Sequence, residues 1–121
     1  MPTSQSSHEA YDQNGFVFPI DVISTIEAQQ LRADLESAES ELAGDPEKLM
    51  LLRSYPDRLL PSFDRLIRNP NLINVVSAIL GNDLMVWSGS LFLKEAGSSN
   101  IVTWHQDLNY WGLDETNEIT A

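Results

Sequence analysis

The stretch that decides the fold class is NPNLINVVSAILGNDLMVWSGSLFLK, residues 69–94, because its apolar pattern changes halfway along. Asn69 is a suitable N-cap, Pro70 suits the first helical position, and Gly81 stands just past the last turn. Between them apolar residues recur at helical spacing: Leu72, Val75, Val76, Ile79 and Leu80. From residue 84 onward branched and aromatic residues dominate. The stretch therefore predicts a helix followed by a strand.

Further helical patterns lie on the N-terminal side of this stretch. Ser24 and Glu27 have the spacing of a capping box, which predicts a helix that begins there and runs to about residue 42. A second helical piece is expected after Ser62. Residues 1–10 are polar and are expected to form a disordered tail.

Strand patterns occupy the rest of the chain. Residues 15–20 predict a short first strand at a sheet edge, residues 84–94 a strand with Gly89 as a bulge, and residues 101–104 another. Residues 119–121 resemble the opening of one more strand, which favours a truncated chain. Helices followed by strands predict an α+β fold.

Composition limits the classes of partner. The 121 residues suffice for one small domain, and their net charge of −11 disfavours nucleic acid and anionic membrane surfaces as partners. The sequence has no cysteine, no apolar run long enough to span a membrane, and no secretory signal pattern at its start. These features favour a cytoplasmic protein.

The residues with the clearest chemistry are His105 and Asp107, in the run WHQDLNYWG at 104–112. Side chains two positions apart in an extended segment project from the same face, so these two should lie together with Gln106 turned away. An imidazole nitrogen and a carboxylate oxygen there could take two corners of one metal ion, and a second histidine would complete an iron(II) facial triad. The simpler alternative is a solvated histidine beside an aspartate.

The sequence resembles the phytanoyl-CoA dioxygenase family, a branch of the iron(II)/2-oxoglutarate-dependent oxygenases built on a double-stranded β-helix (jelly roll). The resemblance runs from about residue 11 to the end, and its most specific part is Trp-His-Gln-Asp at 104–107 followed by Tyr110 and Trp111. It implies that residues 11–121 are the N-terminal part of an oxygenase domain, with N-terminal helices and only the first strands of the β-helix present.

The resemblance also implies functional roles. His105 and Asp107 would be two iron ligands, with 2-oxoglutarate and dioxygen as cosubstrates, and the retained aspartate favours hydroxylation over halogenation. The family's third ligand is a later histidine, followed by an arginine that binds the distal carboxylate of 2-oxoglutarate. The only other histidine here, His8, does not match that position.

Other candidate residues have weaker signals. Lys94 could steer an anionic cosubstrate, or could be a solvated lysine at a strand end. Tyr110 and Trp111 could line the entrance for an unknown small-molecule substrate, although aromatic residues more often pack in a core. Trp87 and Trp104 are expected to be core residues.

Two other functions stay open on sequence grounds. The chain could be a non-catalytic, truncated relative that acts as a folded fragment or interaction module. A zinc- or manganese-binding protein of the cupin type is a third hypothesis. A partial β-helix would leave sheet edges open, so self-association through those edges is expected.

Overall fold

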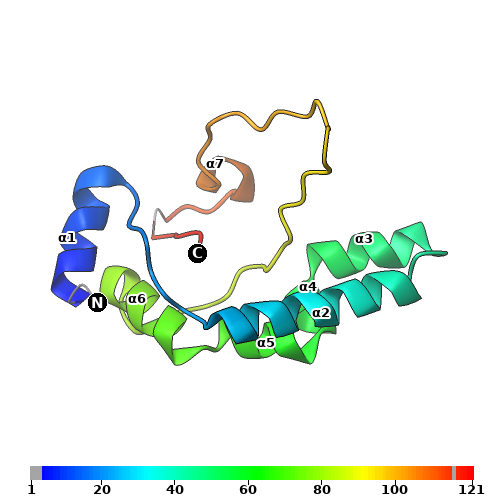
Figure 1. Ribbon diagram of the computed structural model, residues 1–121. Helices are drawn as coiled ribbons and strands as arrows, with labels where there is room; N and C mark the ends of the chain where they lie inside the picture. Colours follow the sequence, from blue (N-terminus) through cyan, green and yellow to red (C-terminus); the bar gives the residue numbers. More distant parts are fainter. Residues whose placement is uncertain (1–3, 116) are drawn as a thin grey trace.

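The computed structural model describes residues 4–115 and 117–121 of the chain, and within them all regular structure is helical (Figure 1). The helices are α1 (Ser4–Asn14), α2 (Thr25–Glu41), α3 (Pro46–Ser54), α4 (Pro56–Leu59), α5 (Pro61–Ile67), α6 (Pro70–Leu80) and α7 (Leu108–Trp111). Between α6 and α7, residues 81–107 form a long arc without helix or strand, which leads away from α6 and then returns toward it.

The helices form two groups. Helices α2 to α5 pack together, and an ion pair between Glu39 and Arg53 at 2.8 Å joins α2 to α3. Helix α1 packs on α6, so residues 4–10 of the expected disordered tail belong to a helix, while residues 1–3 lie outside the described part. A hydrogen bond from the Asn71 side chain to the Val22 carbonyl, 3.0 Å, connects the two groups.

Two predicted helix starts are confirmed. The Ser24 hydroxyl accepts from the Glu27 backbone N–H while the Glu27 carboxylate accepts from the Ser24 N–H, which completes a capping box. Asn69 caps α6 through the N–H of Asn71, and Gly81 ends that helix at a positive φ of 91°.

The prolines explain why residues 46–80 form four separate helices. Helices α3, α4, α5 and α6 each begin with proline, at positions 46, 56, 61 and 70. Proline suits a first helical position but disfavours helical geometry in the residue before it. Each proline therefore begins a helix and prevents the preceding one from continuing. The sequence analysis missed α3 and α4, although Asp45, which caps α3, was a usable signal.

The predicted α+β fold is wrong: the described residues contain no strand, and hence no part of a jelly roll. Residues 15–20, 84–94, 101–104 and 119–121 are all non-helical, but none pairs with another segment in a ladder. A strand requires a neighbour whose backbone takes its N–H and C=O groups. The N–H of Leu91, for example, donates to the Arg53 carbonyl at the end of α3 rather than to a strand.

Little apolar surface is buried. Leu52 is the one fully buried hydrophobic side chain among the described residues, at 2% exposure. Trp104, expected in the core, is fully exposed, and the arc exposes further large apolar side chains: Met85, Val86, Trp87, Phe92, Leu93, Ile101 and Val102. Since the described residues have no sheet, self-association through open sheet edges loses its basis. Along the described helices, none has the length and apolar character required to cross a lipid bilayer.

Gly89 anchors the arc on the helices, rather than forming a bulge. A Cβ atom at position 89 would lie 2.6 Å from Oδ1 and 3.3 Å from Cβ of the buried Asp57. Two residues later the Leu91 N–H donates to the Arg53 carbonyl at 2.8 Å. Glycine therefore permits a close approach that brings the arc against α4.

Gly89→Ala should detach the arc from α3 and α4, because rotating the Asp57 carboxylate relieves the Oδ1 contact but not the Cβ contact. We expect a loss of about 1–3 kcal/mol in unfolding free energy and faster hydrogen exchange at the Leu91 amide. Gly44→Ala is the control, since nothing lies within 4 Å of a Cβ there. Unchanged exchange at Leu91 in Gly89→Ala would contradict this anchoring.

The capping box of α2 should make stability depend on pH. Hydrogen bonds from the Ser24 backbone and then from its hydroxyl lower the pKa of Glu27 below its ordinary value. A lowered carboxyl pKa stabilises the fold at neutral pH, and that contribution disappears as the pH falls through the lowered pKa. Glu27→Gln should therefore lower the melting temperature at neutral pH but much less in acid below the lowered pKa. An equal decrease at both pH values would count against the cap.

Candidate metal centre

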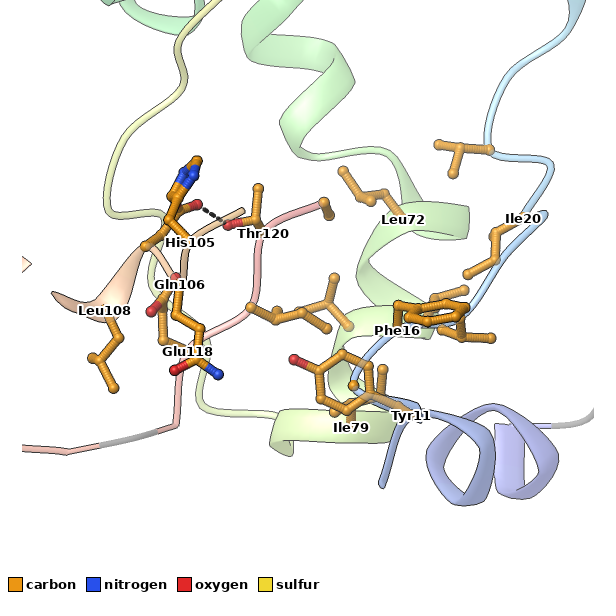
Figure 2. Close-up of a pocket in the computed structure, with 18 residues that line it drawn as sticks. Tyr11, Phe16, Ile20, Leu72, Ile79, His105, Gln106, Leu108, Glu118 and Thr120 are labelled. Carbon is orange, nitrogen blue, oxygen red and sulfur yellow. Dashed lines mark hydrogen bonds and ion pairs between the residues drawn. The ribbon is translucent and has the colours of Figure 1, made fainter. Parts of the chain in front are cut away.

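His105 lies where the arc ends (Figure 2), and Asp107 directly precedes α7. Asp107 occupies the position before α7, but its carboxylate does not cap that helix. The turn is fixed by backbone bonds instead, from Asn109 to the Gln106 carbonyl and from Tyr110 to the Asp107 carbonyl. The Asp107 side chain is thus left to face His105.

The two side chains are close together, as the sequence predicted. His105 Nε2 lies 3.1 Å from Asp107 Oδ1, and the side chains are 36% and 31% exposed. The cause differs from the one expected, because a turn rather than a strand brings them together. Gln106 was expected to point away but lines the same cavity.

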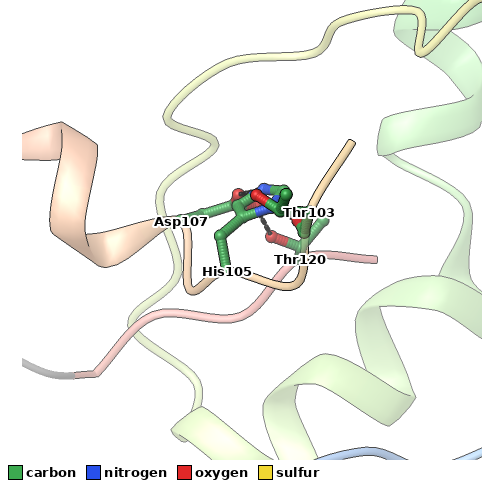
Figure 3. A network of polar contacts seen from close by, with 4 residues as sticks. All are labelled: Thr103, His105, Asp107 and Thr120. Carbon is green, nitrogen blue, oxygen red and sulfur yellow. Dashed lines mark hydrogen bonds and ion pairs between the residues drawn. The ribbon is translucent and has the colours of Figure 1, made fainter. Parts of the chain in front are cut away.

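Thr103 determines which nitrogen of His105 is free. The Thr103 carbonyl lies 2.7 Å from His105 Nδ1 and accepts its proton (Figure 3). In a neutral imidazole this leaves a lone pair on Nε2, the atom that faces Asp107. Two acceptors 3.1 Å apart repel unless a positive charge lies between them. That charge is either a proton on Nε2 or a metal ion.

The spacing fits a metal ion. Bonds of ~2.1 Å at right angles place two ligand atoms about 3 Å apart. The observed 3.1 Å between Nε2 and Oδ1 agrees with neighbouring corners of an octahedral site. A backbone carbonyl that orients a histidine through its other nitrogen is the usual second partner of a metal-binding imidazole.

Thr120 is a site residue that the sequence analysis missed. Its hydroxyl donates to Asp107 Oδ2 at 2.5 Å, across 13 positions of the chain (Figure 3). The two carboxylate oxygens therefore have different partners, His105 on one side and Thr120 on the other. No local motif pointed to Thr120, because its role depends on how the last residues fold back.

The predicted aromatic residues lie around this pair. The Tyr110 ring meets His105 edge to face, with ring centres 5.8 Å apart, although Tyr110 itself is largely exposed. Trp111 stacks on Trp87 at 5.9 Å, which ties α7 to the arc. Trp111 therefore stabilises the turn that carries Asp107.

A cavity of about 770 Å³ adjoins the pair. One wall is polar and comes from residues 105–107 and 118–120, while apolar side chains face it from the other side (Figure 2). Those apolar residues come from residues 15–22 and from α6: Phe16, Val17, Ile20, Val22, Leu72, Val75, Val76 and Ile79. The apolar stripe predicted for α6 thus lines the cavity and is only half-buried.

The charges at the cavity bear on the expected cosubstrate. Of the described residues that line it, Asp107 and Glu118 are acidic and none is basic. Lys94 is exposed on the arc and does not line the cavity. These residues therefore do not fit the distal carboxylate of 2-oxoglutarate, which requires a cationic partner.

The described part of the chain has no group of three or more histidine, cysteine, aspartate or glutamate side chains placed to hold a metal ion. His8 lies on α1, where it pairs with Asp12 at 3.4 Å. No protein-family model, curated protein or solved structure matches the chain.

The cavity should accept apolar ligands through its α6 wall. Octanol titrated into the labelled protein should shift the amide resonances of Phe16 and Ile79. Val76→Glu should weaken that binding at least about tenfold, because it places a charge on an apolar wall. The control is Ile73→Glu, on the same helix but outside the cavity and already 40% exposed. Equal weakening by both variants would contradict this assignment of the wall.

Proposed function

We propose that this chain contributes two of the three protein ligands of an iron(II) site in a 2-oxoglutarate-dependent hydroxylase of the phytanoyl-CoA dioxygenase type. His105 Nε2 and Asp107 Oδ1 are the ligand atoms. The observation that supports this proposal is that these two acceptors face each other at 3.1 Å while the Thr103 carbonyl holds the imidazole proton on the opposite nitrogen. The proposed compartment is the cytoplasm, whose reducing conditions suit ferrous iron.

The proposal requires groups that these 121 residues do not supply. The resemblance implies a further histidine as the third ligand, and the two histidines here are His8 and His105. His8 belongs to α1 and pairs with Asp12, so it is not that ligand. The arginine for 2-oxoglutarate must also come from elsewhere, since no lysine or arginine is among the described residues that line the cavity.

The chain's own residues have distinct tasks in this proposal. Thr103 fixes the tautomer of His105, and Asp107 contributes a negative charge that favours a divalent cation. The apolar wall of α6 and residues 15–22 receives the hydrocarbon part of a small substrate and excludes water from it. Iron(II), 2-oxoglutarate and dioxygen would supply the oxidising power for hydroxylation.

The two alternatives use the same residues differently. In a non-catalytic relative, a proton would hold His105 and Asp107 together as a hydrogen-bonded ion pair. In a zinc or manganese protein, a cation would bind without need of 2-oxoglutarate. Metal binding at the pair would distinguish the proposed hydroxylase from the non-catalytic relative. Binding of 2-oxoglutarate would distinguish it from the zinc or manganese protein.

Manganese(II), a paramagnetic substitute for iron(II), should broaden the nuclear resonances of residues 103–107 and 118–120. His105→Ala and Asp107→Ala should each abolish that local broadening, because one remaining ligand does not hold the ion there. His8→Ala is the matched control, as it removes an exposed histidine that also pairs with an aspartate. Broadening confined to other acidic residues, or unaffected by His105→Ala, would refute the metal site.

Cosubstrate binding tests the reaction class. Under anaerobic conditions, iron(II) and 2-oxoglutarate together should give the wild-type protein a visible absorption band that Asp107→Ala lacks. Metal binding at the pair without this band would favour the plain cation site over the hydroxylase.

A further inference from the structure

We propose that Thr120 is a positioning residue that makes Asp107 bind metal through one oxygen instead of two. This inference rests on the iron site proposed above and concerns how the carboxylate is presented to the ion. Nothing in the local pattern around His105 and Asp107 predicts it, because Thr120 lies 13 positions after Asp107.

The geometry divides the carboxylate between two partners. Oδ2 accepts the Thr120 hydroxyl at 2.5 Å, while Oδ1 faces His105 Nε2 at 3.1 Å. A hydrogen bond this short to an ionised carboxylate is among the stronger kinds. The four residues gather at one place (Figure 3), and a metal ion that contacts Nε2 meets Oδ1 first because Oδ1 is the oxygen beside Nε2.

The consequence concerns the number of open coordination positions. A carboxylate binds a cation through one oxygen or through both. The Thr120 hydroxyl competes for Oδ2 and so favours binding through Oδ1 alone. One-oxygen binding preserves the three open positions that a facial triad offers to cosubstrate and dioxygen. Two-oxygen binding would occupy one of them.

Thr120 is well suited to substitution because its side chain is not a packing residue. It is exposed, and it lies in the last few residues, outside every helix. Valine has the same shape as threonine but lacks the hydroxyl, so Thr120→Val removes the donor with little change in volume. Thr25→Val is the matched control, since Thr25 is an exposed threonine at the start of α2 and has no part in the site.

Cobalt(II) is a suitable probe because the intensity of its visible bands reports coordination number. Thr120→Val should weaken cobalt binding about 10–100-fold, the usual effect of losing a group that orients a ligand. Its bands should also become weaker, as the carboxylate takes a second position. Thr120→Ser should restore both the affinity and the spectrum, and Thr25→Val should leave both unchanged.

Any other result of the cobalt titrations contradicts the role of Thr120. Cobalt binding by the wild type shows whether the proposed metal site is contradicted as well. If the wild type binds cobalt at the pair but Thr120→Val matches it, Thr120 has no positioning role and the proposed site stands. Equal effects of Thr120→Val and Thr25→Val, or a failure of Thr120→Ser to restore binding, would reveal a general structural effect. If the wild type does not bind cobalt at the pair, the site and the inference both fall.

Discussion

The central constraint in this protein is the repulsion between two hydrogen-bond acceptors, His105 Nε2 and Asp107 Oδ1, held 3.1 Å apart. The Thr103 carbonyl takes the imidazole proton on the far side, and the Thr120 hydroxyl takes the other carboxylate oxygen. His105 Nδ1 and Asp107 Oδ2 therefore each have a hydrogen-bond partner, and the space between Nε2 and Oδ1 is left for a positive charge. The function of the site depends on whether a proton or a metal ion fills that gap.

The fold serves this pair by bringing three distant segments to one cavity. Gly89 lets the arc approach Asp57 closely, and the stack of Trp87 on Trp111 holds α7 against the arc. Helix α6 supplies the apolar wall opposite the pair. Because so few side chains are fully buried, these few contacts determine the position of the site more than a continuous core does.

Local signals predicted local features well. The caps at Ser24 and Asn69 are confirmed because a cap depends on residues two or three positions away. The strands were wrong because a strand depends on a partner segment, which a pattern of branched and aromatic residues cannot supply. The approach of His105 to Asp107 was predicted from an extended segment but is produced by a turn, whereas Thr120 joins them only through the return of the chain after α7.

The most direct test of the central claim is anomalous diffraction from crystals soaked in manganese(II). We expect an anomalous peak within about 2.3 Å of both His105 Nε2 and Asp107 Oδ1, with Nδ1 still bonded to the Thr103 carbonyl. A peak elsewhere, or no peak and a direct hydrogen bond between His105 and Asp107, would mean that a proton fills the gap. The pair would then be a structural ion pair.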